Sequence, residues 1–289
     1  MTAYVALEST VLAHGLPYPF NLELSNELEA IVSSENALAQ TVGIIDGQIR
    51  CSLTREEIER MCFEEGVRKV SIKDIPICMA RGWTGATTVA ATIRLARRQG
   101  MRVMATGGIG GIHRGTDGSP VPDESADLSE LAANPMTVVC AGPKAVLHLE
   151  ATRERLETLG ITVLGWKTDS MPAFYCGSSD HVVDARCDTI AEVAQVVRSR
   201  DELGSPQAIL LCVPLSDSIA LDYAEVSNVV EDALASEPAE KLLPNEITPF
   251  LLTRVREALG DRALEANLEI LRQNARIAAQ ISVELVRQS

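Results

Sequence analysis

The chain has 289 residues, of which 46% are hydrophobic and only 3% aromatic, and its formal net charge is −14. This length and composition predict one large α/β domain over residues 1–289, with a core of aliphatic side chains. The acidic balance argues against binding of a nucleic acid polymer or an anionic membrane surface, but it is compatible with a locally basic pocket for a phosphorylated sugar or nucleotide.

The seven cysteines are scattered, and no two of them form a C-x-x-C motif. An odd number of thiols, most of them in apolar runs, is typical of a reduced cytoplasmic protein without a structural zinc site. No apolar run reaches the roughly 18 residues that a membrane span needs. The sequence opens on a strand pattern without the features of a signal peptide, so we expect a cytoplasmic protein with no membrane partner.

The first part of the chain alternates between short apolar runs and helical patterns. Strands are predicted at Tyr4–Leu7, Thr41–Asp46, Gln48–Leu53, Val67–Ile72 and Met101–Ala105, with the second and third forming a hairpin around Gly47. Helices are predicted at Asn21–Ser34, from Thr54 to Glu64 and at Ala86–Arg98. Thr54 and Glu57 have the spacing of a capping box.

The same alternation continues and then gives way to helices. Strands are predicted at Met136–Cys140, Ile161–Gly165, Val182–Ala185 and Ala208–Val213. Helices are predicted at Asp127–Ala133, Ala145–Leu159, Thr189–Ser199, Tyr223–Ser236, Pro249–Leu259 and Ala263–Val286, with a loop at Pro238–Pro244. Alternating strands and helices favour a three-layer α/β/α fold with a mainly parallel sheet, and the C-terminal third is predicted to be helical.

One glycine-rich stretch, residues 101–127, has the composition of a ligand site. Its strand ends in four glycines whose backbone N–H groups a ligand can approach closely: Gly107, Gly108, Gly110 and Gly111. His113 and Arg114 follow, and Asp123 and Asp127 close the stretch. This order is expected at the carboxyl edge of a parallel sheet, where ligands bind. The alternative is a glycine-rich connection that only turns a corner.

Two residues that follow apolar strands carry reactive groups. Lys144 comes after the strand at residues 136–140, where desolvation lowers a lysine pKa and exposes the lone pair that Schiff-base formation needs. Glu8 ends the first strand, where a carboxyl group with a pKa near neutrality can serve as a proton donor or base. The alternatives are a phosphate-binding or surface lysine and a hydrogen-bonding glutamate.

Asp123 and Asp127 are four residues apart. If both lie on the first turn of one helix, they share a face, and their oxygens suit Mn²⁺ or Mg²⁺. The alternative is that Asp123 is a helix N-cap. A phosphate cradle is predicted from cations and hydroxyl groups at a strand end and a helix start: Lys69, Lys73, Thr87, Thr88 and His113.

Several common motifs are absent. His113 stands at the third glycine position of a dinucleotide fingerprint, and the P-loop, H-E-x-x-H and G-x-S-x-G patterns do not occur. Instead, eight stretches in order along nearly the whole chain resemble the pseudouridine-5′-phosphate glycosidase family, also called indigoidine synthase A-like proteins. They are ALESTVLAHGLPYP (6–19), KVSIKDIP (69–76), GATTVAATI (85–93), ATGGIGGIHRG (105–115), ESADLSELA (124–132), TVVCAGPK (137–144), PAFYC (172–176) and TPFLL (248–252).

The resemblance implies an enzyme that reversibly cleaves the C–C glycosidic bond between ribose 5-phosphate and uracil. Lys144 matches the lysine that bonds to ribose C1′, and Glu8 matches the acid that donates a proton. Asp123 matches the aspartate that binds a metal, usually Mn²⁺ held largely through water. Substrate contacts are implied for Lys69, Val89, His113, Ser125, Ala126, Asp127 and Asn267, to which the cradle adds Thr88. The family is typically a homotrimer with an α/β/α architecture.

Some positions depart from the family pattern, among them Trp83, Trp166 and the strand end Val213–Ser216. They motivate a second hypothesis, a C-glycosynthase that joins ribose 5-phosphate to an aromatic natural-product acceptor. A third hypothesis is a catalytically silent ribose-phosphate binding protein, which the presence of Lys144, Glu8 and Asp123 disfavours.

Overall fold

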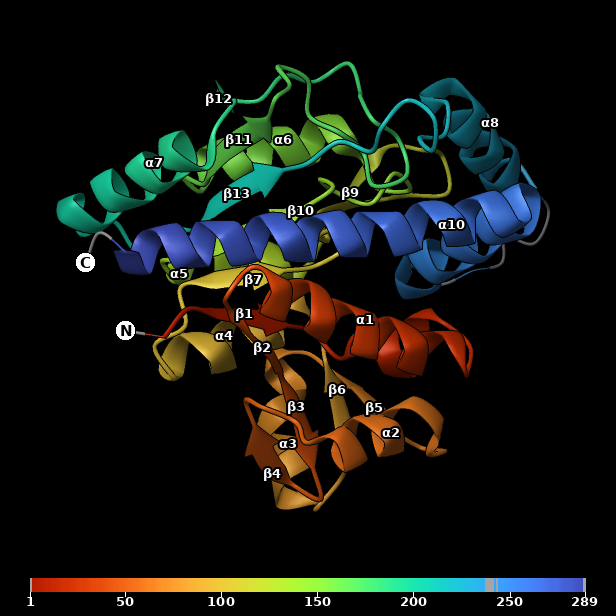
Figure 1. Ribbon diagram of the computed structural model, residues 1–289. Coiled ribbons are helices and arrows are strands. Elements are labelled where there is room, and N and C mark those ends of the chain that lie inside the picture. Colours follow the sequence, from red (N-terminus) through yellow and green to blue (C-terminus); the bar gives the residue numbers. More distant parts are fainter. Residues whose placement is uncertain (1, 237–241, 243, 288–289) are drawn as a thin grey trace.

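The computed structural model describes residues 2–236, 242 and 244–287, and its centre is a seven-strand sheet (Figure 1). All neighbouring strands in this sheet are parallel, as predicted. Their order is β12 (Ala185–Cys187), β11 (Thr162–Trp166), β13 (Ile209–Cys212), β10 (Thr137–Cys140), β7 (Val103–Ala105), β1 (Tyr4–Leu7) and β2 (Leu38–Thr41). Edge strand β2 is missing from the sequence prediction because it is short and only one of its residues is buried.

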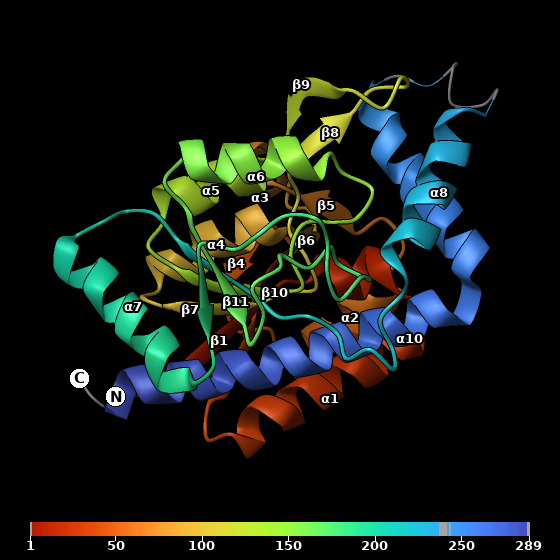
Figure 2. The same cartoon turned by 90° about the horizontal axis from the view of Figure 1, so that it is seen from above.

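Helices cover both faces of this sheet, which confirms the three-layer α/β/α prediction (Figure 2). Alternate strand residues bury on opposite faces: Val5 joins one core cluster and Ala6 the other. The first face packs against α1 (Phe20–Ser34), α7 (Ile190–Leu203) and α10 (Pro244–Arg287). The second face packs against α4 (Val89–Arg98), α5 (Ala126–Ala133) and α6 (Leu149–Thr158).

A second, four-strand sheet lies beside the first (Figure 1). Its order is β4 (Gln48–Arg50), β3 (Gly43–Ile45), β6 (Gly85–Thr87) and β5 (Arg68–Val70). The predicted hairpin around Gly47 is confirmed, and so is the capping box of Thr54 and Glu57 at the start of α2 (Arg55–Phe63). The prediction of helix from Ala86 is wrong for its first residues, which form β6. The helix starts only after Thr88, whose hydroxyl accepts from the Ala91 N–H.

Other boundaries differ from the predictions for local reasons. Helix α6 begins at Leu149 rather than Ala145, because His148 Nδ1 caps it by accepting from the Ala151 N–H. Strand β12 is displaced by three residues from its predicted start. An antiparallel ribbon of β8 (Ile112–Arg114) and β9 (Pro120–Glu124) was not predicted. Helix α3 (Ile75–Ala80) is a further short element that the sequence pattern did not indicate.

The helical C-terminal third is confirmed. It comprises α8 (Tyr223–Leu234) and α10, which contains a non-helical break at Gly260 between the two predicted helices. The predicted loop at residues 238–244 falls mostly outside the described residues. In the part of the chain that the structure describes, no helix combines the length and apolarity needed to cross a membrane.

Candidate active site

The site lies where three neighbouring strands of the main sheet end. Glu8 follows β1, Gly107 and Gly108 follow β7 closely, and Lys144 follows β10 after a short turn. Because β10, β7 and β1 are adjacent and parallel, these residues meet at one edge of the sheet. A cavity of about 190 Å³ opens there. It is lined by four of the predicted site residues, Glu8, Lys69, Lys144 and Asn267.

Glu8 stands in surroundings that favour its protonated form. Burial raises its pKa above the ordinary value, and Asp127 raises it further. The hydroxyl of Thr106 opposes this shift by donating a 2.5 Å hydrogen bond to Glu8 Oε1, and the Lys144 and Lys69 ammonium groups also lower the pKa. A carboxyl group with a raised pKa keeps its proton to a higher pH than an ordinary glutamate does, and it can release that proton into the cavity.

The charge of Lys144 affects the pKa of the neighbouring Lys69. Burial lowers the pKa of Lys69, and the positive charge of Lys144 lowers it further, while Glu8 and Asp127 oppose the shift. The backbone before Lys144 is held against the glycine-rich loop, since the Ile109 N–H donates to Gly142 O and the Lys144 N–H donates to Ile109 O, both at 3.1 Å. This pairing fixes the point from which the Lys144 side chain enters the cavity.

Only glycine fits at the centre of the lysine turn. Gly142 has φ +82°, and a Cβ atom there would lie 2.0 Å from the carbonyl oxygen of Pro172. The glycines after β7 also make room for protein atoms: a Cβ on Gly108 would lie 2.6 Å from the Phe174 ring, and one on Gly110 would lie 2.2 Å from Ser125 Oγ. The approach of a ligand stays a prediction for Gly107 and Gly108, which line the cavity, whereas Gly110 leaves room for Ser125.

A second group of predicted residues surrounds the start of α4, next to the cavity. The Asp127 carboxylate accepts from the Ala90 N–H at 2.9 Å and from the Gly110 N–H at 2.8 Å. Ser125 is the N-cap of α5 and accepts from the Asp127 N–H. Thr88, Val89 and Ala126 are the cap and first residues of these two helices. Asp127 thus ties the glycine loop to the N-terminus of α4.

The prediction that Asp123 and Asp127 share a helix face is wrong, and so is the N-cap alternative for Asp123. Asp123 lies in strand β9, outside α5, and its Oδ2 is 2.8 Å from His113 Nδ1 on the facing strand. Neither His113 nor Asp123 is among the residues that line the cavity. The chain changes from strand to helix at Ser125, between the two aspartates. The Asp123 carboxylate consequently contacts His113, whereas the Asp127 carboxylate binds the start of α4.

The number of metal-ligating side chains near Asp123 decides which kind of metal site fits there. No group of three or more His, Cys, Asp and Glu side chains able to hold a metal occurs in the described ranges. A cation at Asp123 would therefore take most of its ligands from water and substrate. Mg²⁺ and Mn²⁺ accept this arrangement, because they commonly bind through one or two carboxylates and keep several waters. The half-exposed carboxylate of Asp123 fits that mode.

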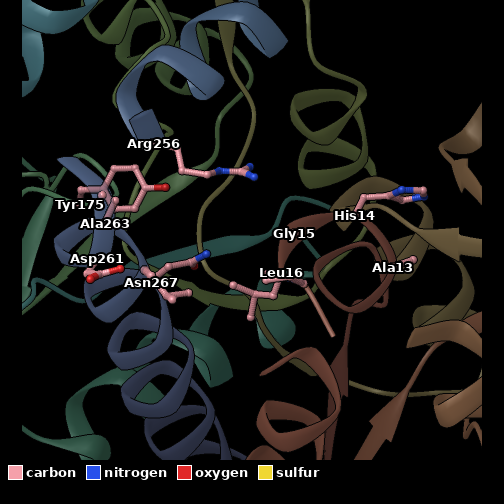
Figure 3. A pocket seen from close by; sticks show the side chains of 12 residues that line it. Ala13, His14, Gly15, Leu16, Tyr175, Arg256, Asp261, Ala263 and Asn267 are labelled. Carbon is pink, nitrogen blue, oxygen red and sulfur yellow. The ribbon is translucent and has the colours of Figure 1, made fainter. Parts of the chain in front are cut away.

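A larger outer cavity of about 500 Å³ adjoins the first, and Figure 3 shows the side chains that line it. The two cavities share five lining residues, which are His14, Gly15, Tyr175, Arg256 and Asn267. Burial and the charge of Lys69 lower the pKa of His14, which keeps its ring neutral at pH 7. The two cavities therefore adjoin along these shared residues, two of which belong to α10.

Sequence reasoning missed several residues of this space. Thr106, Phe174, Tyr175 and Arg256 contact Glu8 or line the cavities, but none was a predicted site residue. Phe174 and Tyr175 belong to the PAFYC stretch, which is the signal that points to them. Phe174 adopts φ +45°, a conformation rare for a bulky residue and concentrated at functional sites. Arg256 has no signal in the sequence.

A comparison with protein families agrees with this geometry. The family profile described as indigoidine synthase A like protein matches residues 1–284. The chain belongs to the indigoidine synthase A-like family. Similar relatives include the pseudouridine-5′-phosphate glycosidases of Symbiobacterium thermophilum and Paracoccus denitrificans, each 44% identical over 283 residues, which is 97% of this chain and 92% of the relative.

Solved structures of the indigoidine synthase A-like family share the fold. An indigoidine synthase A-like protein from Thermotoga maritima has a TM-score of 0.89 and 34% identity, covering 98% of this chain and 93% of that one. The prealnumycin C-glycosynthase AlnA, solved in complex with ribulose 5-phosphate, has a TM-score of 0.91 and 34% identity, covering 99% of this chain and 92% of that one.

The departures from the family pattern lie elsewhere in the molecule. Trp83 lines neither cavity, and the Arg68 guanidinium lies 4.7 Å from its ring centroid. Trp166 also lines neither cavity and packs against the core between the sheet and α7. Pro214 and Leu215 line a separate surface pocket with Lys167. The two tryptophans therefore give no argument for an altered acceptor site.

Proposed function

We propose that this chain reversibly cleaves pseudouridine 5′-phosphate to uracil and ribose 5-phosphate. The observation that carries the proposal is the convergence of Glu8, Lys69 and Lys144 on one cavity, in a chain 44% identical to pseudouridine-5′-phosphate glycosidases. An amine, a carboxyl group with a raised pKa and a second cation are the groups this reaction requires. The net charge of −14 makes this basic cavity a local exception on an acidic protein.

A C–C glycoside has no heteroatom leaving group, so protonation alone does not break its bond. In the proposed reaction Lys144 Nζ bonds to ribose C1′, the C1′–O4′ bond breaks, and O4′ takes a proton. Glu8 then donates a proton to the base carbon. The C1′–C bond breaks as the nitrogen lone pair forms an imine at C1′. Water hydrolyses the imine, which releases ribose 5-phosphate and restores Lys144.

The phosphate is assigned to the end of the cavity near Lys69 and the start of α4. Lys69 lines the cavity, and Thr88 and Val89 stand at a helix N-terminus, where backbone N–H groups favour an anion. In this assignment Ser125, Ala126 and Asp127 border the ribose, and His113 approaches the phosphate from the ribbon. Binding of these parts of the substrate positions C1′ at Lys144 and contributes to catalysis.

Asp123 is proposed to hold Mn²⁺, or Mg²⁺, largely through water. When bound, the ion would supply positive charge beside the phosphate. His113 supports this role by holding Asp123 Oδ2, which leaves Oδ1 for the ion or its water.

A homotrimer in the cytoplasm is proposed as the working form. Tyr18, Phe20 and Phe63 are large aromatic side chains that stay exposed in the single chain, and a subunit contact would cover such groups. All seven cysteines are free thiols, which suits a reducing compartment. Light scattering of the purified protein tests the trimer, and a monomeric mass would contradict it.

A C-glycosynthase with an aromatic acceptor is the second candidate. The likeness to AlnA supports it, and so does an outer cavity of about 500 Å³ that offers room for an acceptor larger than uracil. Both candidates use Lys144. They differ only in whether uracil or a larger aromatic acceptor occupies the cavity beyond Lys144.

The deciding experiment follows uracil and ribose 5-phosphate by chromatography after adding pseudouridine 5′-phosphate and Mn²⁺. Wild-type protein should release both, and Lys144→Ala should lower turnover by at least roughly a thousandfold. Lys73→Ala is the control and should keep its activity, because the structure leaves this lysine of the predicted cradle exposed and outside both cavities. Borohydride should trap ribose 5-phosphate on the wild type and on Lys73→Ala, and it should not do so on Lys144→Ala. An adduct without uracil release would favour the synthase, and no adduct would favour a silent binder.

A further inference from the structure

We infer that Arg256 determines specificity for the base, by donating hydrogen bonds to a carbonyl oxygen of the heterocycle that is released in the reaction at Lys144. The inference rests on the proposed function and assigns a role to a residue that the sequence resemblance does not include. It follows from the position of Arg256, from its lack of a carboxylate partner among the described residues and from the chemistry of its neighbours.

The break in α10 brings Arg256 into the site. In a continuous helix, residues 256 and 267 would lie about 16 Å apart along the axis. Gly260 interrupts the helix with φ 52° and ψ −131°, and Arg256 and Asn267 consequently line the same two cavities. In Figure 3 the Arg256 guanidinium, the Asn267 amide and the Tyr175 hydroxyl all point into the shared space.

Within the described residues, Arg256 differs from other arginines of α10 in having no carboxylate partner. Four other arginines of this helix form ion pairs, namely Arg254 with Glu257, Arg262 with Glu225, Arg272 with Glu27 and Arg276 with Glu35. Arg256 forms no ion pair with any carboxylate in the described part of the chain, although Asp261 lines the outer cavity with it. Its guanidinium is therefore available to a ligand.

The neighbours of Arg256 form a binding site for a flat, polar ring. The rings of Phe174 and Tyr175 meet edge to face with centroids 4.4 Å apart, and Leu252 and Leu271 add apolar surface. A guanidinium only donates hydrogen bonds, whereas an asparagine amide both donates and accepts. A ring edge that alternates carbonyl, N–H and carbonyl matches these two side chains. The Asn267 amide can accept from the N–H and donate to one carbonyl, and Arg256 can donate to the other carbonyl.

An alternative role for Arg256 is to bind the phosphate, and the residues that line the two cavities argue against this role. In the proposed function, Lys69 and the N-terminus of α4 already provide the anion site. Arg256 lines the outer cavity, which neither Lys69 nor Lys144 does. With C1′ at Lys144 and the phosphate at Lys69, the base is the part of the nucleotide that extends toward α10.

The test is steady-state kinetics of Arg256→Met with pseudouridine 5′-phosphate. KM should rise by roughly tenfold to a hundredfold with little change in kcat, because the same contact is lost from the bound substrate and the transition state. Inhibition by ribose 5-phosphate, which lacks the base, should be unchanged. Arg256→Lys should recover only part of the loss, because an ammonium group lacks the forked donors.

Arg254→Met is the matched control, since Arg254 lies on the same helix and pairs with Glu257 on the exposed surface. It should leave KM unchanged. An unchanged KM in Arg256→Met would overturn the inference, and so would an equal weakening of ribose 5-phosphate inhibition, which would place Arg256 at the phosphate. If wild type releases no uracil, the proposed function itself fails, and the role of Arg256 fails with it.

Discussion

The hydroxyl of Thr106 donates a 2.5 Å hydrogen bond to Glu8 Oε1, which joins the ends of two neighbouring strands of the main sheet. Thr106 is itself held on both sides. Its N–H donates to Val139 O at 3.0 Å, and its carbonyl accepts from Asn274 Nδ2 at 2.8 Å. The proton donor of the proposed reaction is therefore positioned by β7, β10 and α10 together.

This relationship predicts the pH dependence of Thr106→Val. The lost hydrogen bond stabilises the charged form of Glu8, so its removal should raise the pKa of Glu8 further. Cleavage needs protonated Glu8, and the decline of kcat/KM at alkaline pH should move to higher pH. Thr106→Ser keeps the hydroxyl and should retain the wild-type profile. Superimposable pH profiles for wild type and Thr106→Val would contradict the positioning role.

Lys69→Met should weaken the binding of both phosphorylated ligands, pseudouridine 5′-phosphate and ribose 5-phosphate. The loss of a charged hydrogen bond predicts a rise of roughly tenfold to a hundredfold in both KM and the inhibition constant of ribose 5-phosphate. In wild type, burial lowers the pKa of Lys69. As the pH rises, Lys69 should therefore lose its charge, and the affinity for phosphate should decrease, at a lower pH than with an ordinary lysine. Lys73→Met is the control at an exposed lysine. Unchanged ribose 5-phosphate inhibition would rule out Lys69 as the anchor.

Gly142→Ala tests the turn that carries Lys144. The new Cβ would lie 2.0 Å from Pro172 O, at a position with φ +82°. Gly118→Ala is a matched control, because Gly118 has φ +79° and open space around it. Backbone strain is common to both, and the clash should cost Gly142→Ala about 1–3 kcal/mol more in unfolding free energy. Chemical denaturation measures this difference. Equal stabilities would show that the turn can shift without cost.

Treatment with a chelator tests the metal proposed at Asp123. Turnover should fall after chelation and return with added Mn²⁺. Asp123→Asn should need a higher Mn²⁺ concentration for half-maximal activity, because an amide oxygen binds a hard cation more weakly than a carboxylate does. Asp117→Asn, in the exposed connection of the same ribbon, should behave as wild type. Full turnover in the chelated wild-type protein would exclude a metal requirement.

The sequence by itself determined the layers of the fold and the places of the reactive groups on them. Apolar periodicity located most of the parallel strands, although not edge strand β2. The Thr54 and Glu57 capping box started α2, and Lys144 and Glu8 followed apolar strands. These features depend on residues close together in the chain, so their patterns are visible without a structure. The roles of the two residues stay predictions until turnover is measured.

Only the tertiary structure decided which groups meet. The Thr106–Glu8 bond spans 98 residues, the Asn274–Thr106 bond 168, and the Asp127–Ala90 bond 37. Arg256 lines the cavity because the break at Gly260 changes the direction of α10. Asp123 and Asp127 lie on different elements because strand β9 ends between them, at Glu124. Such contacts depend on strand order and chain direction. These are set by packing of the whole core, and no local spacing in the sequence encodes them.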